Sequence, residues 1–106
     1  MLAREIDKKI NFDSVSVVMP AYNEGIRICD NILAVDKELS SYLTDYEIIC
    51  VNDGSTDNTL YEMNVAADSN PHVHIITYND NAGKGHAVKA GIAAATKTYT
   101  VFIDSL

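Results

Sequence analysis

The stretch YEIICVNDGSTD at residues 46–57 changes abruptly from apolar to polar, and this change decides how the chain folds. Its apolar half ends at Val51 and suits a buried strand, whereas Gly54 with its small polar neighbours suits a tight turn. Helix-compatible residues follow from Asn58, so the segment predicts a strand, a polar turn and a helix in succession. In an open parallel sheet such a turn lies at the carboxyl end of its strand, where ligands bind. Gly54 is expected to let a ligand approach the backbone there.

The rest of the chain repeats this plan. Strands are expected at residues 15–19, 47–51, 72–78 and 99–103, and helices at residues 25–43, 58–68 and 85–96. Pro20 is expected to end the first strand, because proline cannot donate to a strand ladder. Strands that alternate with helices over short links predict a parallel sheet with right-handed crossovers and helices on both faces. The expected fold class is therefore α/β, with three α/β/α layers and a mostly parallel, Rossmann-like sheet.

Apolar residues at helical spacing predict which side of each helix faces the sheet. The residues expected to point inward are Ile28, Ile32, Val35 and Leu39 in the first helix, Leu60, Met63 and Ala67 in the second, and Val88, Ile92 and Ala95 in the third. Thr56 or Asp57 is expected to cap the second helix.

The 106 residues are enough for one small domain. We expect residues 14–106 to form it and residues 1–13, which are charged and weakly periodic, to be mobile or weakly ordered. Because the chain stops just after the last expected strand, we expect a domain that is truncated at its C-terminal end. The sheet edge left open by such a truncation favours self-association, so a homo-oligomer is expected.

Charge and cysteine usage narrow the class of protein. The net charge of −7 argues against a nucleic-acid binder or a patch for anionic lipid, since both need a basic surface. The sequence has no run of about 18 apolar residues, and its start is too charged for a signal peptide. Cys29 and Cys50 show no metal-ligand spacing, so we expect reduced thiols in a cytoplasmic protein.

Polar residues follow each expected strand, and the carboxyl ends of parallel strands meet at one edge of a sheet. The candidates for ligand contact at that edge are Tyr22, Asn23, Glu24, Asp53, Asp57, Lys84 and Asp104. Acidic groups gathered there repel one another unless a cation or a ligand rich in hydrogen-bond donors is present. A nucleoside diphosphate with a divalent metal suits such a place, because base and ribose donate to carboxylates while the metal bridges carboxylate and phosphate.

Four ordered motifs carry a resemblance to a known family. They are PAYNE at residues 20–24, VNDGSTDNT at residues 51–59, NAGKGHAVKAGI at residues 81–92 and FID at residues 102–104. Together they resemble the donor-binding half of the family 2 glycosyltransferases, which have the glycosyltransferase A fold, and are most similar to the dolichyl- and polyprenyl-phosphate sugar transferases. The resemblance implies the N-terminal part of an inverting hexosyltransferase that moves sugar from a UDP- or GDP-linked donor to an acceptor such as a polyprenyl phosphate or a glycan. Any membrane association would come through parts beyond this chain.

The resemblance also implies roles for individual positions. The implied nucleotide-binding residues are Pro20, Ala21, Tyr22, Glu24, Val51, Asp53, Lys84, Asp104 and Ser105. Tyr22 would pack on the base, Asp53 would accept hydrogen bonds from base and ribose, and Lys84 would favour the phosphates. Asp104 would be the first acid of the Asp-x-Asp motif and a ligand of Mg²⁺ or Mn²⁺. Leu106 stands where the second acid is expected, and the catalytic base is expected beyond it.

Each of these residues also has a purely structural interpretation. Asp57 is more typical of a helix cap than of a ligand contact, and Asp53 could simply fix its own turn. Tyr22 could be a rim aromatic without a partner, and Glu24 a first-turn acid that favours the helix dipole. Lys84, flanked by glycines, could be a solvated loop charge.

The sequence leaves one main functional alternative and argues against two others. Leu106 at the metal position favours a nucleotide-binding module without catalysis. A flavodoxin-like domain that accepts phosphate needs an acidic pair after the first strand, where this chain has Pro20, Ala21 and Tyr22. The triplet GKG at residues 83–85 lacks the rest of a phosphate-loop signature, so an NTPase is not expected.

Overall fold

The computed structural model describes residues 14–104. Its strands are β1 (Val15–Ala21), β2 (Tyr46–Asp53), β3 (Val73–Tyr78) and β4 (Tyr99–Phe102), and its helices are α2 (Ile28–Ser40), α3 (Thr59–Asp68) and α4 (Lys84–Ala94). The expected order of elements is confirmed, with ends that differ by a few residues. The expectations for residues 1–13, Ser105 and Leu106 lie outside the described residues.

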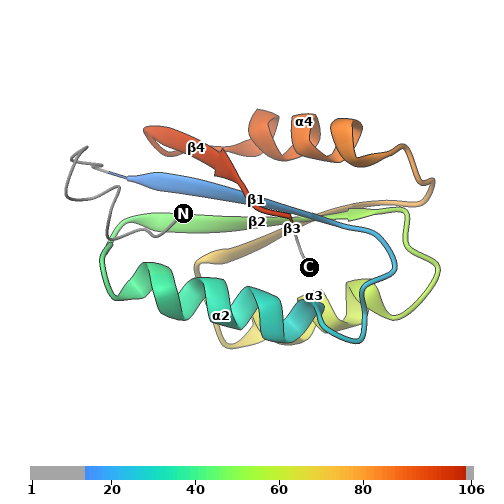
Figure 1. Ribbon diagram of the computed structural model, residues 1–106, viewed down its shortest axis with the longest axis horizontal. Helices are drawn as coiled ribbons and strands as arrows, with labels where there is room; N and C mark the ends of the chain where they lie inside the picture. The colour runs from blue at the N-terminus through green and yellow to red at the C-terminus, as the bar shows by residue number, and fades with distance from the viewer. Residues whose placement is uncertain (1–13, 105–106) are drawn as a thin grey trace.

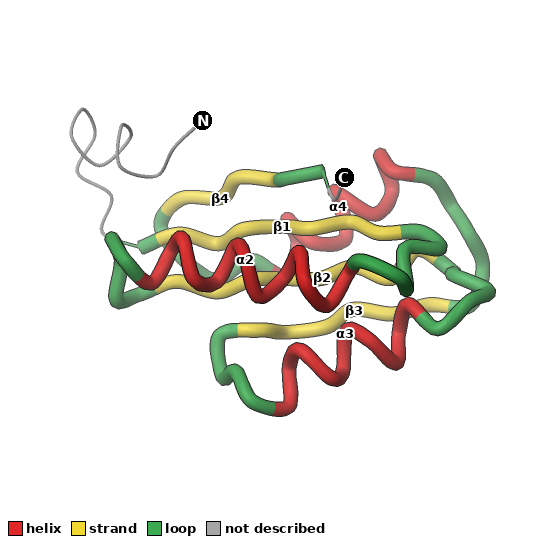
Figure 2. Tube along the Cα trace, turned by 60° about the horizontal axis from the view of Figure 1, so that its bottom comes forward, coloured by secondary structure: helices red, strands yellow, loops and turns green. Residues whose placement is uncertain are grey.

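The four strands form one parallel sheet in the order β3-β2-β1-β4. Helices α2 and α3 lie together on one face of the sheet and α4 covers the other (Figures 1 and 2). The three-layer α/β/α prediction is thus confirmed. After β3 the chain crosses to the opposite side of β1, so the strand order reverses between β1 and β4. Reversals of this kind are where open α/β sheets bind ligands.

The central strands β1 and β2 are buried at every position, because helices cover both of their faces. On the α2 side, Ile28 and Ile32 pack with Met63 of α3 against the sheet, as the helical spacing predicts. On the α4 side the core is smaller and includes Val18 and Ile49. The larger part of the apolar core therefore lies between the sheet and the α2–α3 layer.

The inward face of α4 differs from the prediction. Ile92 is 49% exposed, whereas Ala87 and Gly91 are buried against the sheet. A Cβ atom added at Gly91 would overlap the side chain of Val18. Small residues face the sheet because α4 lies very close to it. The prediction assumed that the large apolar residues of a helix face the sheet, and for α4 this assumption is wrong. Val88 and Ala95 are half-buried.

Pro20 does not end the first strand, because β1 runs on to Ala21 with Pro20 in register with Val51. The carbonyl of Val18 accepts the N–H of Ile103 from the β4 side. Two residues on, Pro20 faces that same side, but the β4 ladder has ended at the Val18–Phe102 pair. The missing N–H therefore costs no ladder hydrogen bond.

Both cysteines are free thiols, as expected: Cys50 is buried and Cys29 half-buried. Burial raises the pKa of Cys50 to about 12. Burial, together with the nearby carboxylates of Glu62 and Asp30, raises the pKa of Cys29 as well. Across residues 14–104 no helix has the length and apolar character needed to cross a membrane.

Candidate functional site

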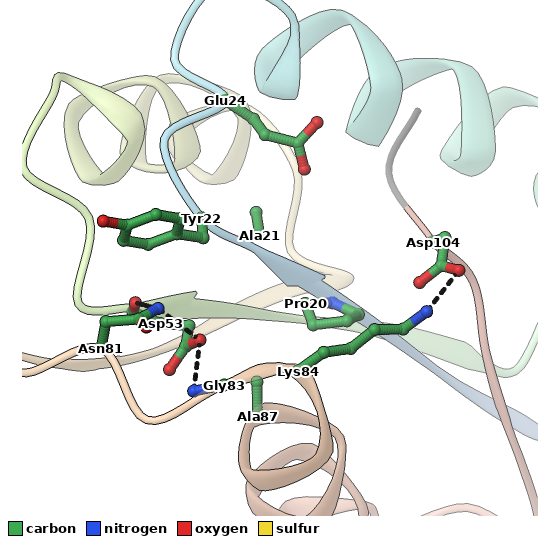
Figure 3. Close-up of a pocket in the computed structure, with 10 residues that line it drawn as sticks. All are labelled: Pro20, Ala21, Tyr22, Glu24, Asp53, Asn81, Gly83, Lys84, Ala87 and Asp104. Atoms are coloured by element: carbon green, nitrogen blue, oxygen red, sulfur yellow. Dashed lines mark hydrogen bonds and ion pairs between the residues drawn. The ribbon is translucent and has the colours of Figure 1, made fainter.

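A hollow of about 420 Å³ opens at the carboxyl ends of the strands, where the strand order reverses (Figure 3). Its lining residues are Pro20, Ala21, Tyr22, Glu24, Asp53, Asn81, Gly83, Lys84, Ala87 and Asp104. They come from the ends of β1 and β2, from the turn before α4, from α4 itself and from the segment after β4. The structure thus brings together residues that lie as much as 84 positions apart, Pro20 and Asp104.

Seven of the nine predicted nucleotide-binding residues line this hollow, and Val51 does not. Val51 is fully buried and packs with Val18, Ile49 and Ala87 beneath it. Its predicted place at the ligand is corrected: as a residue of a central strand it belongs to the core on the α4 side. Ser105 lies outside the described residues.

The loop after β1 is held by the loop after β2. Asn23 adopts a left-handed backbone conformation with φ of 51°. Its Oδ1 accepts the N–H groups of Thr56 at 2.8 Å and Asp57 at 3.3 Å, and its own N–H donates to Ser55 Oγ at 2.9 Å. These hydrogen bonds fix the backbone next to Tyr22. The Tyr22 side chain lines the hollow and is 46% exposed.

The N-cap of α3 is Asn58, so the expected cap at Thr56 or Asp57 is one or two residues too early, but Asp57 still has a structural role beside it. Its Oδ1 accepts the Thr59 N–H at 2.9 Å at the start of α3, and Oδ2 accepts the Gly25 N–H at 3.1 Å. Hydrogen bonding from the Thr59 hydroxyl is the main reason why the pKa of Asp57 lies below its usual value. Asp57 therefore joins the two loops and does not line the hollow.

Asp53 is only 3% exposed, and its carboxylate accepts four hydrogen bonds from the chain itself. Oδ1 accepts the Tyr78 hydroxyl at 2.8 Å and the Ala82 N–H at 2.9 Å. Oδ2 accepts Asn81 Nδ2 at 2.8 Å and the Gly83 N–H at 3.0 Å. Burial and the hydrogen bond to Asp53 raise the pKa of Tyr78 to about 12. A carboxylate has about four lone-pair sites, so Asp53 is fully used in fixing the turn at residues 81–83.

The turn before α4 also packs closely against the backbone of Gly54. Gly54 has a positive φ of 63°, and a Cβ atom there would overlap the backbone of Asp80 and Asn81. The expectation that Gly54 admits a ligand is therefore wrong. What approaches its backbone is the chain's own turn before α4.

Lys84 and Asp104 form an ion pair of 2.6 Å across the opening of the hollow (Figure 3). Both side chains are about half exposed. Lys84 is the first residue of α4 rather than a loop residue, so the positive end of the helix dipole adds to its charge. This side of the hollow suits an anionic group such as phosphate.

Comparisons with known proteins agree with this geometry. The profile described as Glycosyl transferase family 2 matches residues 16–105. The chain belongs to glycosyl transferase family 2. Among curated relatives, the uncharacterized glycosyltransferase YibD of Escherichia coli is 36% identical over 95 residues, which cover 88% of this chain and 26% of YibD. The dolichyl-phosphate beta-glucosyltransferase of Dictyostelium discoideum is 31% identical over 109 residues, covering 94% of this chain and 33% of that protein.

Two solved structures of the glycosyltransferase A fold match this family 2 chain. The mannosyltransferase PcManGT of Pyrobaculum calidifontis, in complex with GDP-Man and Mn²⁺, superposes with a TM-score of 0.73 and 26% identity over 85% of this chain and 26% of its own. Glucosyl-3-phosphoglycerate synthase of Mycobacterium tuberculosis, in complex with UDP, gives 0.70 and 26% over 99% of this chain and 38% of its own. The chain thus spans about a quarter to two fifths of the length of these relatives.

The residues at the hollow fit a divalent metal only in part. Among residues 14–104 no cluster of three or more His, Cys, Asp or Glu side chains could hold one. Asp104 offers one carboxylate, now paired with Lys84. Because Mg²⁺ is often held by one or two carboxylates together with substrate phosphates, Asp104 fits a metal that it shares with a bound diphosphate.

Sequence reasoning missed Asn81, Gly83 and Ala87 as lining residues. Asn81 and Gly83 flank Ala82 in the turn that precedes Lys84. The available signal was an amide side chain and a glycine in a turn already expected at the ligand edge. Ala87 could have been found only by knowing how closely α4 approaches the sheet.

Proposed function

We infer that this chain forms the donor-binding part of an inverting family 2 glycosyltransferase, which takes a nucleotide-diphospho-sugar and transfers its sugar to an acceptor. The observation that carries this inference is the hollow at the strand-order reversal, with an aromatic ring on one side and the Lys84–Asp104 pair on the other (Figure 3). Tyr22 packs on the base, while Lys84 and the N-terminus of α4 attract the diphosphate.

In the reaction, an acceptor oxygen attacks the anomeric carbon from the face opposite the diphosphate. The new carbon–oxygen bond forms as the bond to the leaving phosphate oxygen breaks, and the acceptor proton passes to a base supplied from outside this chain. A bound Mg²⁺ or Mn²⁺ would neutralise charge that develops on the leaving diphosphate. Asp104 would hold that metal, and Lys84, released from Asp104, would hold the phosphate.

The acceptor and the cellular setting follow from the same family. A relative named dolichyl-phosphate beta-glucosyltransferase favours a polyprenyl phosphate as acceptor, with a glycan as the alternative. We place the protein in the cytoplasm, with any membrane contact made by parts outside this chain. The second candidate function is a nucleotide-binding module without catalysis, favoured by Leu106 at the second metal position.

A thermal-shift and titration screen of UDP, GDP and their sugars, each with and without Mn²⁺, tests the proposal. A specific ligand at about 100 times its Kd should stabilise the chain by about 3 kcal/mol. The variant Tyr22→Ala should lose most of this gain, whereas Tyr61→Ala, which removes an exposed ring outside the hollow, should keep it. Absence of any shift with every nucleotide would overturn the proposal. Binding that ignores Mn²⁺ would favour the module without catalysis.

Self-association of the chain is a separate part of the proposal. Among residues 14–104, β3 and β4 are the outer strands of the sheet, and Phe102 on β4 is 54% exposed next to Ile103 at 38%. An open edge with apolar neighbours invites pairing with a second copy. Sedimentation should show a dimer that grows with concentration, and a monomer across the whole range would refute this.

A further inference from the structure

Strand β3 has one open edge. It is the end strand in the order β3-β2-β1-β4, and within residues 14–104 it pairs only with β2 (Figures 1 and 2). The Ile48 N–H donates to the carbonyl of His72 at 2.8 Å, so the backbone groups of His72 and of every second residue after it face β2. The backbone groups of Ile75 and Thr77 therefore face outward.

These outward groups are available to another strand. Among the described residues, no donor or acceptor pairs with the backbone N–H or C=O of Ile75 or Thr77. A row of unpaired backbone groups along an edge is a template on which a further strand can add.

Strand β3 also lacks the features that usually protect an edge. Its sequence VHIITY contains no Lys, Pro, Asp or Glu, and its six residues pair with β2 in one unbroken register without a bulge. Its apolar side chains are only half-buried: Ile75 packs with the core on the α2–α3 side, and Ile76 and Tyr78 with the core on the α4 side. A strand placed alongside would cover more of them on both faces of the sheet.

We propose that β3 pairs with β3 of a second copy of this chain, so that the two sheets join into one. This pairing rests on the self-association proposed for the chain and does not depend on donor binding. Because both copies use the same surface, the pair has twofold symmetry and its strands run antiparallel. The His72 end of each strand then lies beside the Asp80 end of its partner, and the two Asp80 carboxylates do not face each other.

The edge at β4 is the weaker candidate for this contact. Strand β4 has four residues against six in β3, and its ladder with β1 ends at the Val18–Phe102 pair. The chain also leaves β4 toward Asp104, so any further segment would depart from that side of the sheet. Strand β3 lies at the opposite edge.

Removing one outward N–H from each copy tests the pairing. Thr77→Pro deletes such an N–H and puts a ring on the open edge, while the backbone groups that face β2 belong to other residues. Sedimentation should give a dimer dissociation constant about 5- to 150-fold higher than that of wild type, the range for one net hydrogen bond lost in each copy.

Two matched variants serve as controls. Thr77 Oγ1 accepts the Asn52 Nδ2 hydrogen at 3.0 Å, and Thr77→Val removes this bond but retains the backbone N–H. Thr100→Pro makes the same change on β4: the Tyr99 N–H donates to the Ser14 carbonyl, so the next residue, Thr100, faces outward. Both variants should keep the wild-type dimer.

Amide hydrogen exchange of wild type adds a measurement that needs no variant to fold. As the concentration rises through the dimer dissociation constant, exchange at Ile75 and Thr77 should slow, whereas exchange at Thr100 and Phe102 should not change.

The outcomes separate the choice of edge from self-association itself. A dimer that Thr77→Pro leaves at wild-type strength, or exchange that slows at Thr100 and not at Thr77, overturns pairing through β3 and leaves self-association standing. Equal weakening by Thr77→Val or by Thr100→Pro also overturns it, because loss of the Asn52 contact or a general effect of proline would then explain the result. A monomer at every concentration overturns both, and nucleotide titration of the same samples tests donor binding separately.

Discussion

Strand β2 carries a buried carboxylate near each end, and the two serve the same helix. Glu47, near the amino end, accepts the Thr96 N–H at 2.8 Å just after α4. Asp53, at the carboxyl end, accepts the N–H groups of Ala82 and Gly83 just before α4. One strand therefore tethers α4 at both of its ends through charge-assisted hydrogen bonds, which are stronger than neutral ones.

The two tethers differ in how completely their oxygens are used. Asp53 accepts two hydrogen bonds on each oxygen. Glu47 accepts three on Oε2, from Ser16 and Thr96, while Oε1 faces the half-exposed ring of His74 at 3.7 Å. The carboxylate at the end of the sheet that bears the hollow thus accepts four hydrogen bonds, against three at the opposite end.

Removing Asp53 should have the largest effect. In Asp53→Ala the Tyr78 hydroxyl and the N–H groups of Ala82 and Gly83 lose a buried acceptor, so the free energy of unfolding should fall by about 3–4 kcal/mol. Nucleotide binding should be lost as well, because the turn that lines the hollow before α4 is released. Urea denaturation and nucleotide titration measure the two effects, and retention of wild-type nucleotide affinity would show that the turn does not need this tether.

Removing the opposite tether should cost less and spare the hollow. Glu47→Ala leaves three donors without their acceptor where Asp53→Ala leaves four, so we expect a smaller loss of about 2 kcal/mol by urea denaturation. Nucleotide affinity should change by less than about twofold, because well-separated sites behave independently. A large loss of affinity would mean that the two ends of α4 are coupled, and the comparison of separate tethers would fail.

Gly91 tests whether the tethers set the distance between α4 and the sheet. In Gly91→Ala the new methyl group meets the side chain of Val18, and we expect a loss of about 1–2 kcal/mol. Gly85→Ala, on the same helix with open space around its Cβ, should instead stabilise by up to about 1 kcal/mol. In the Glu47→Ala background the loss of stability caused by Gly91→Ala should be smaller, because α4 without this tether can move away from the sheet. If the loss of stability is the same in both backgrounds, apolar packing alone sets the distance between α4 and the sheet.

Local patterns predicted what depends on local chemistry. The apolar runs gave β1 and β2, and the spacing of Ile28, Ile32 and Leu39 gave the buried side of α2. The convergence of polar turns at one edge followed because strands that alternate with helices must run parallel. That rule alone placed Tyr22 and Asp104 at one hollow.

The errors arose where a distant segment decides the outcome. Asp53 uses its oxygens on residues 25–30 positions further along the chain, and no local pattern specifies those partners. Gly54 and Gly91 are explained by close approach of other backbone and side-chain atoms, which sequence spacing does not reveal. Val51 lies in a motif that resembles the family's, which placed it at the ligand, but its side chain is buried in the core.

The smallest expected effect is the pH dependence of the Glu47 tether. Burial alone would raise the pKa of Glu47, but hydrogen bonds from Ser16 and Thr96, helped by His74, outweigh it and hold the pKa below its usual value of 4.5. A lowered pKa in the folded state stabilises the fold above the unfolded pKa, and this stabilisation is lost as pH falls through the folded value.

The free energy of unfolding of wild type, measured in urea from about pH 7 to about pH 3, should therefore fall on acidification more steeply than that of Glu47→Gln. The glutamine keeps the size of the side chain and one acceptor oxygen but cannot titrate. Acid loss that comes from Asp57, whose pKa is also lowered, persists in both proteins and cancels in the comparison. Parallel curves for the two proteins would mean that Glu47 tethers α4 through its shape and hydrogen bonds, with no contribution from its charge.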